Sequence, residues 1–269
     1  MRIRLGYEII VSHPQATPVL AHLSVHESRN ENLITPDQIK TDPYVPIRQY
    51  RDALGNLVSR FTAPAGKIHI FADALISDTG ALDRQVPDAI QHEISDLPDA
   101  TLHFLLGSRY CETDKMVETA WAQFGNIIGG WNRVQAICAF THDRIRFGYQ
   151  FARNTRTAYE AYEERIGVCR DFAHLAVTLC RCMNIPARYC TGYLGDIGVP
   201  KDPAPMDFSA WFEAYIGGQW LTFDARHNIP RIGRVLVARG MDAADAAITT
   251  HFGKNTLELF RVWTDELAD

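Results

Sequence analysis

The hydrophobic pattern of the chain changes twice, and the order of the three patterns limits the folds that it can adopt. Residues 1–80 contain short apolar runs or alternations, which are separated by turn signals such as Asp42-Pro43. Residues 96–183 place apolar side chains at helical spacing, and residues 187–225 return to strand-like patterns. Strands, then helices, then strands predict an α+β fold.

The strand-rich N-terminal segment is expected to be a unit of its own. Residues 1–90 are predicted to form an antiparallel β-sandwich, and residues 91–269 a second unit of helices and strands. Residues 52–61 have the pattern of a hairpin, because the Gly55-Asn56 step can take positive φ between two apolar arms. Residues 168–183 are predicted to form a helix, which Gly167 precedes.

The charge and composition of the chain exclude several classes of function. Its 269 residues include 27 basic and 32 acidic side chains without a basic cluster, so no nucleic-acid partner is expected. No apolar stretch is long enough to span a membrane, and charged residues interrupt the first positions where a secretory leader would be apolar. A cytoplasmic location is therefore expected. No nucleotide or flavin motif occurs, so no cofactor is expected, and the oligomeric state stays open.

One of the six cysteines has the position of a nucleophile. The six are too sparse for a disulfide framework and are expected to be free thiols. Cys180, Cys182 and Cys190 match no common zinc spacing, so no metal site is expected. Cys169 begins the predicted helix, where unpaired backbone N–H groups and the helix dipole favour a thiolate and can stabilise an oxyanion. The alternative for Cys169 is a buried core thiol.

The sequence around Cys169 closely resembles the core motif of the bacterial transglutaminase-like family, which belongs to the papain-related superfamily. The stretches that carry the resemblance are Gly167-Val168-Cys169-Arg170-Asp171-Phe172-Ala173-His174-Leu175, Trp211-Phe212-Glu213-Ala214-Tyr215 and Phe223-Asp224. The resemblance implies a transglutaminase-like core in which helices pack on an antiparallel sheet. It also implies that Cys169 is the nucleophile, that Asp224 is the orienting carboxylate, and that the substrate is a peptide or a protein.

The chain departs from the family pattern at the general base. The family has histidine in the tripeptide that here reads Ser209-Ala210-Trp211, and serine cannot take the thiol proton at neutral pH. If Gly217 and Gly218 form the turn between the two strands, Ser209 shares a face with Asp224, whereas His227 points to the other face. His227 could still turn inward if the alternation ends at Asp224. His227 is therefore the candidate replacement base, and a structural or exposed loop histidine is the alternative.

Neighbours of Asp224 and Cys169 have further expected roles. Arg226 follows Asp224 closely and is a candidate ion-pair partner for it. Asp171 lies two residues beyond Cys169 and can complement the positive end of the helix, so a solvated or cap-related role is expected for it rather than catalysis.

Three functional interpretations follow. The first is a cysteine-dependent enzyme that hydrolyses amide bonds or transfers their acyl groups, as a peptidase, an amidase or a transglutaminase. The second is a silenced protein of the same fold, which binds a peptide or protein partner. The third is an enzyme of this fold whose base has moved to His227. Retention of Cys169 and Asp224 favours an enzyme, and hydrolysis is favoured because water outcompetes amines unless the site excludes it.

Overall fold

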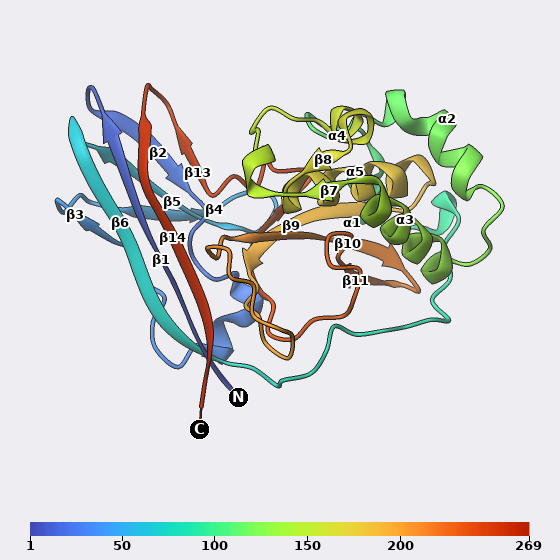
Figure 1. The fold of residues 1–269 in the computed structure, drawn as a ribbon, viewed down its shortest axis with the longest axis horizontal. Coiled ribbons are helices and arrows are strands. Elements are labelled where there is room, and N and C mark those ends of the chain that lie inside the picture. The colour runs from blue at the N-terminus through green and yellow to red at the C-terminus, as the bar shows by residue number, and fades with distance from the viewer. Residues whose placement is uncertain (269) are drawn as a thin grey trace.

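The computed structural model describes residues 1–268, which fold into a unit of sheets beside a unit of helices packed on a further sheet (Figure 1). The three four-stranded sheets are antiparallel, and one two-stranded pair is parallel. The predicted α+β class is confirmed. Among the described residues, no helix has both the length and the apolar character needed to cross a membrane.

Two four-stranded sheets with the orders β14-β1-β6-β3 and β13-β2-β5-β4 form the first unit. Alternate residues of β1 from Ile3 to Val11 are buried, and they share one hydrophobic core with Val19 and Phe61 of the other sheet. Their strands are β1 (Arg2–His13), β2 (Thr17–Ala21), β3 (Lys40–Asp42), β4 (Arg48–Arg51), β5 (Leu57–Ala63), β6 (Gly66–Ser77), β13 (Thr249–His251) and β14 (Thr256–Leu267).

The C-terminal strands return to the N-terminal sheets. β14 pairs with β1 from Arg2↔Leu267 to Ser12↔Thr256, and β13 pairs with β2. The predicted division at residue 90 did not include this return, since it assigned residues 91–269 to the second unit. Pairing between strands at opposite ends of a chain depends on which sheet edges remain unpaired in the fold. The local spacing of apolar residues does not indicate this.

The second unit packs helices on the sheet β11-β10-β9-β12. Its helices are α1 (Asp99–Leu102), α2 (Thr113–Phe124), α3 (Gly130–Arg144), α4 (Ala158–Glu164) and α5 (Cys169–Cys182), and its strands are β7 (Arg146–Phe147), β8 (Ile166–Gly167), β9 (Ala187–Tyr193), β10 (Ser209–Ile216), β11 (Gln219–Phe223) and β12 (Val235–Gly240). Short 3-10 helices are η1 (Glu27–Asn32), η2 (Ile94–Asp96), η3 (His103–Leu105) and η4 (Tyr149–Phe151). The expected helix over residues 168–183 is thus found within one residue at each end.

Helix α5 is the centre of the second unit. It contacts α2, α3, α4, β9 and β10, and nearly every one of its side chains is buried. A helix that is surrounded in this way has little freedom to shift, so the residue at its start is held firmly against the sheet.

The predicted hairpin joins the two units. β4 and β5 pair as Arg51↔Leu57 around a turn in which Gly55 has φ of 83°. The side chain of Asn56, the residue after this glycine, is buried and exchanges two hydrogen bonds with the backbone of Arg239 in β12, at 2.8 and 2.9 Å. The turn therefore anchors the N-terminal sheets to the sheet of the second unit.

One buried and one half-buried histidine give the fold a pH dependence. Burial, aided by nearby Arg170, lowers the pKa of His174 to about 3, and burial beside His13 lowers that of His251 to about 4. The unfolded chain takes up these protons near pH 6.5 and the folded chain does not, so stability falls as the pH drops below about 6.5. Protonation of Asp37 and Asp207, whose pKa burial raises to about 6, has the opposite sign and offsets part of the loss.

We expect the free energy of unfolding to fall by on the order of 2 kcal/mol between pH 7 and pH 4. Urea unfolding at several pH values measures this change. The variant His251→Gln is expected to show a shallower decline, and a decline as steep as that of the unmodified chain would contradict the assignment to His251.

Candidate active site

Cys169 is the first residue of α5, as the sequence predicts. The carboxylate of Asp171 fixes this helix start, because its Oδ2 accepts a hydrogen bond from the Val168 backbone N–H at 2.8 Å. The guanidinium of Arg156 donates to the same oxygen at 3.1 Å. Asp171 is fully buried, so a solvated position is wrong, and its hydrogen bond from the Val168 N–H caps the helix that carries Cys169.

The thiol of Cys169 is covered and uncharged. Only 8% of Cys169 is exposed, and its Sγ donates a hydrogen bond to the Phe208 carbonyl at 3.8 Å. Burial and the negative charge of Asp207 raise the pKa of the thiol to about 12, although Arg226 and the Ala210 backbone N–H act in the opposite direction. The expectation that the helix start yields a thiolate is therefore wrong for the resting protein, because burial outweighs the helix dipole.

The hairpin of β10 and β11 has the predicted register. Gly217 and Gly218 form its turn with φ of 58° and 74°, and Phe212 pairs with Phe223. The ladder ends at Phe223, and the Asp224 carbonyl then accepts a hydrogen bond from the Asn228 N–H at 2.8 Å, which closes a turn. The strand alternation consequently stops before residue 227.

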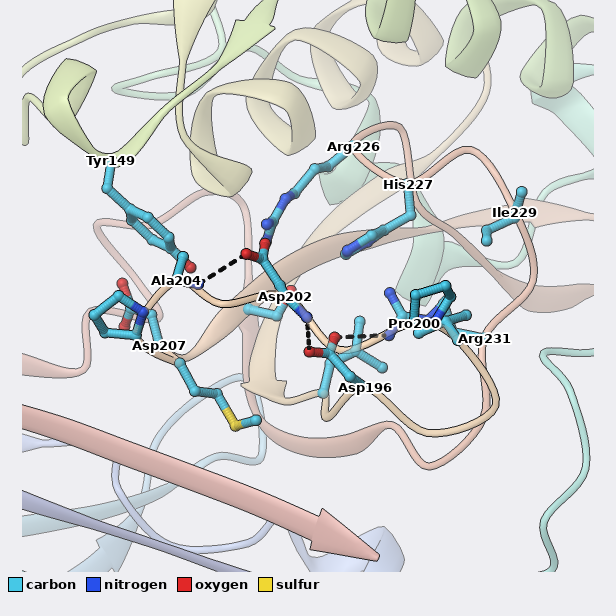
Figure 2. Close-up of a pocket in the computed structure, with 15 residues that line it drawn as sticks. Tyr149, Asp196, Pro200, Asp202, Ala204, Asp207, Arg226, His227, Ile229 and Arg231 are labelled. Atoms are coloured by element: carbon cyan, nitrogen blue, oxygen red, sulfur yellow. Dashed lines mark hydrogen bonds and ion pairs between the residues drawn. The ribbon is translucent and has the colours of Figure 1, made fainter.

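This turn brings His227 against Asp224. Nδ1 of His227 lies 2.8 Å from Oδ2 of Asp224, and the His227 backbone N–H donates to Oδ1 at 3.0 Å. A neutral His227 that donates from Nδ1 keeps its lone pair on Nε2, the form that a general base requires. The imidazole points into the cavity drawn in Figure 2.

Asp224 is a buried, ionised carboxylate. Its side chain is 2% exposed, and Arg234 Nη2 donates to Oδ2 at 2.8 Å. Burial by itself would raise the pKa of Asp224, but the Arg234 charge and the hydrogen bonds of His227 outweigh burial and hold the pKa well below its usual range. The ion-pair partner expected from the sequence, Arg226, instead places its guanidinium 3.8 Å from the ring centroid of Phe147.

Ser209 and His227 line one cavity of about 280 Å³ (Figure 2). The loop between β9 and β10 forms one wall, and Arg231 holds it by an ion pair to Asp196 at 3.6 Å. The polar side chains of the lining are Tyr149, Asp196, Asp202, Asp207, Ser209, Arg226, His227 and Arg231. Two of the four predicted site residues, Ser209 and His227, thus line this cavity, and Asp224 bonds to His227 from outside the lining.

Cys169 lies beside Ser209, but within the part of the chain that the structure describes its sulfur makes no hydrogen bond to the side chains of Ser209, Asp224 or His227. Its sulfur meets backbone groups on both sides of Ser209, and among the described residues no imidazole nitrogen bonds to it. Asp207 and Arg234 were not predicted from the sequence: Asp207 adds to the effect of burial in keeping the Cys169 thiol uncharged, and Arg234 keeps Asp224 ionised. Each lies more than nine residues from the residue that it affects, and no local motif could have indicated either.

Neutralising Asp207 is expected to lower the pKa of Cys169. Asp207 is ionised near pH 8, because its own pKa is about 6, and it opposes formation of the thiolate. We expect the variant Asp207→Asn to react roughly threefold to tenfold faster with iodoacetamide at Cys169 at pH 8, measured by mass spectrometry of the modified peptide. Asp202→Asn, which removes another carboxylate of the cavity, is the matched control. An unchanged or slower reaction of Asp207→Asn would contradict the assigned charge effect.

Comparisons with known proteins match both units of the chain. Residues 121–225 match the family described as the transglutaminase-like superfamily. A solved structure described as a "Putative Cysteine Protease" from Cytophaga hutchinsonii is 30% identical and superposes with a TM-score of 0.85, over 100% of this chain and 91% of that one. The uncharacterized protein ML0607 of Mycobacterium leprae is 23% identical over 231 residues, which are 82% of this chain and 81% of that protein.

Proposed function

The chain belongs to the transglutaminase-like superfamily, and from this premise we propose that it opens amide bonds of peptides or proteins through a thioester on Cys169. One observation carries the proposal, namely the hydrogen bond of 2.8 Å between His227 and Asp224 at the wall of the cavity. A carboxylate that orients an imidazole is the arrangement that activates cysteine nucleophiles, and here residue 227 supplies the imidazole in place of residue 209.

The proposed reaction has two acyl-transfer steps. Sγ of Cys169 leaves the Phe208 carbonyl and attacks the carbonyl carbon of the substrate, while its proton passes to Nε2 of His227. The C–N bond then breaks, and His227 returns this proton to the leaving amine, which leaves a thioester. Because the resting thiol is neutral, attack and proton transfer occur together, and a positioned base is essential.

Water is the proposed acceptor of the acyl group. In the second step, a water molecule attacks the thioester, His227 takes its proton, and the proton returns to Sγ as the carboxylic acid is released. The charged side chains of Asp202 and Arg226 at the cavity keep this region hydrated, so the site does not exclude water in favour of an amine.

A silenced, peptide-binding protein is the second candidate function. The hydrogen bond of the Cys169 sulfur to a carbonyl, together with its raised pKa, is the observation that favours it. A thiol held in this state has no activated nucleophile at rest. Such a protein would use the same cavity to hold a peptide without cleaving it.

Incubation of the purified chain with a library of fluorogenic peptide amides tests the two candidates. The enzyme is expected to release the amine, and acid quenching is expected to trap an acyl adduct on the peptide that contains Cys169. Retention of peptides on the protein without amine release or adduct would support the silenced protein and overturn the proposed enzyme.

A further inference from the structure

Ser209 lines the cavity and has a buried hydroxyl without a partner. Only 5% of Ser209 is exposed, and its Oγ has no hydrogen-bond partner among the described residues. Its carbonyl is satisfied, since it accepts a hydrogen bond from the Thr191 hydroxyl at 3.0 Å. A buried hydroxyl that makes no hydrogen bond destabilises the fold. The Ser209 hydroxyl therefore does not stabilise the folded chain, and its hydrogen bond is available to a ligand.

The position of Ser209 associates the hydroxyl with the nucleophile. The two residues that flank it, Phe208 and Ala210, offer their backbone carbonyl and N–H to the Cys169 sulfur. Ser209 therefore occupies the strand segment that lies directly against the thiol, and the residue lines the same cavity as His227. A substrate carbonyl that enters this cavity for attack by the sulfur comes next to the unpaired hydroxyl.

We propose that the Ser209 hydroxyl donates a hydrogen bond to the acyl oxygen of the substrate during attack by Cys169. This inference rests on the proposed function. As the S–C bond forms, the π electrons of the carbonyl move to its oxygen, and the Ser209 O–H stabilises the negative charge without giving up its proton. When the C–N bond breaks, the electron pair returns to form the thioester carbonyl. Ser209 is then a catalytic residue in its own right, and not merely a position that has lost histidine.

Peptide aldehydes and iodoacetamide distinguish a hydrogen bond to the acyl oxygen from an effect of Ser209 on the reactivity of the thiol. An aldehyde adds the Cys169 thiol across its C=O bond, which gives a hemithioacetal whose oxygen occupies the place of the acyl oxygen in the reaction. Iodoacetamide loses iodide when the sulfur attacks its methylene carbon, and no charge builds on a carbonyl oxygen. A hydrogen-bond donor to the acyl oxygen therefore strengthens aldehyde binding and leaves the rate of alkylation unchanged.

The experiment uses the full chain and a set of N-acetyl dipeptide aldehydes. Protection of Cys169 against iodoacetamide gives the aldehyde affinity, and the unprotected rate gives thiol reactivity. The variant Ser209→Ala is expected to bind the aldehydes roughly tenfold to hundredfold more weakly, with an alkylation rate within about twofold of the unmodified chain. Its melting temperature is expected to be unchanged or higher, whereas a merely structural serine would lower it on replacement.

Thr141→Ala is the matched control, because the Thr141 hydroxyl is also buried without a partner but does not line the cavity. It is expected to leave aldehyde affinity unchanged. If the unmodified chain binds aldehydes at Cys169 and Ser209→Ala binds them equally well, the role of Ser209 is overturned and the proposed function stands. If no aldehyde protects Cys169 in the unmodified chain, the proposed function and the role of Ser209 both fail.

Discussion

Replacement of Cys169 by alanine is expected to abolish amide turnover, with a loss on the order of 10⁶-fold in kcat. Loss of the sulfur removes the only group in the proposed reaction that forms a covalent bond to the substrate, and water cannot use the same position at the start of α5. The measurement is amine release from the fluorogenic peptide amides, together with a search for acyl adducts by mass spectrometry.

Cys182→Ala is a closely matched control for this prediction. Cys182 ends the same helix, its Sγ also donates to a carbonyl, that of Thr113 at 3.5 Å, and burial likewise raises its pKa to about 12. The two thiols differ in their place on the helix, since only Cys169 has the N-terminal N–H groups and lies against the strand segment of Ser209, a residue that lines the cavity. Activity that survives in Cys169→Ala, or that disappears equally in Cys182→Ala, would contradict a nucleophilic Cys169.

Replacement of His227 by alanine is expected to lower kcat by about 10²–10⁴-fold. The resting thiol is neutral, so each turnover needs a group that takes its proton and returns it to the amine. The folded structure should survive, because Asp224 keeps its ion pair with Arg234 and its hydrogen bond from the Arg226 backbone N–H. Measurement of kcat and KM with the fluorogenic peptide amides checks this prediction, and the loss is expected in kcat.

His142→Ala is the control for His227. Nδ1 of His142 bonds the Arg226 carbonyl at 2.8 Å, so this side chain supports the same turn without lining the cavity. We expect its activity to stay within about twofold of the unmodified chain. Equal losses in the two variants would show that the turn matters only as structure, and would remove the case for His227 as the base.

Much of the fold could be predicted from local patterns. The Gly217-Gly218 turn determined the register of β10 and β11, and the glycine before residue 168 together with the apolar spacing gave α5 almost to the residue. The return of β14 to β1 was not predictable in this way, because it pairs segments about 250 residues apart and depends on an open sheet edge.

In the candidate site, too, some positions follow from short sequence motifs and others depend on residues that are distant in the sequence. Ser209, Asp224 and Cys169 could be placed from short motifs, whereas alternation alone put His227 on the wrong face. Its inward position results from the turn that the Asp224 carbonyl closes with Asn228, after the ladder has ended. The charge of the thiol was also missed, since Asp207 and the burial of α5 come from the tertiary structure.

The pairing of β14 with β1 also determines when each unit can finish folding. The helices and the sheet around Cys169 are made of residues 99–240, so during synthesis all of their parts exist before β13 and β14 do. The N-terminal sheets cannot be completed before β13 and β14 exist, because β1 lacks a neighbour on one side until β14 is present. A separately produced piece that ends before residue 249 would expose that edge, and a piece that begins after residue 90 would carry two strands without their partners.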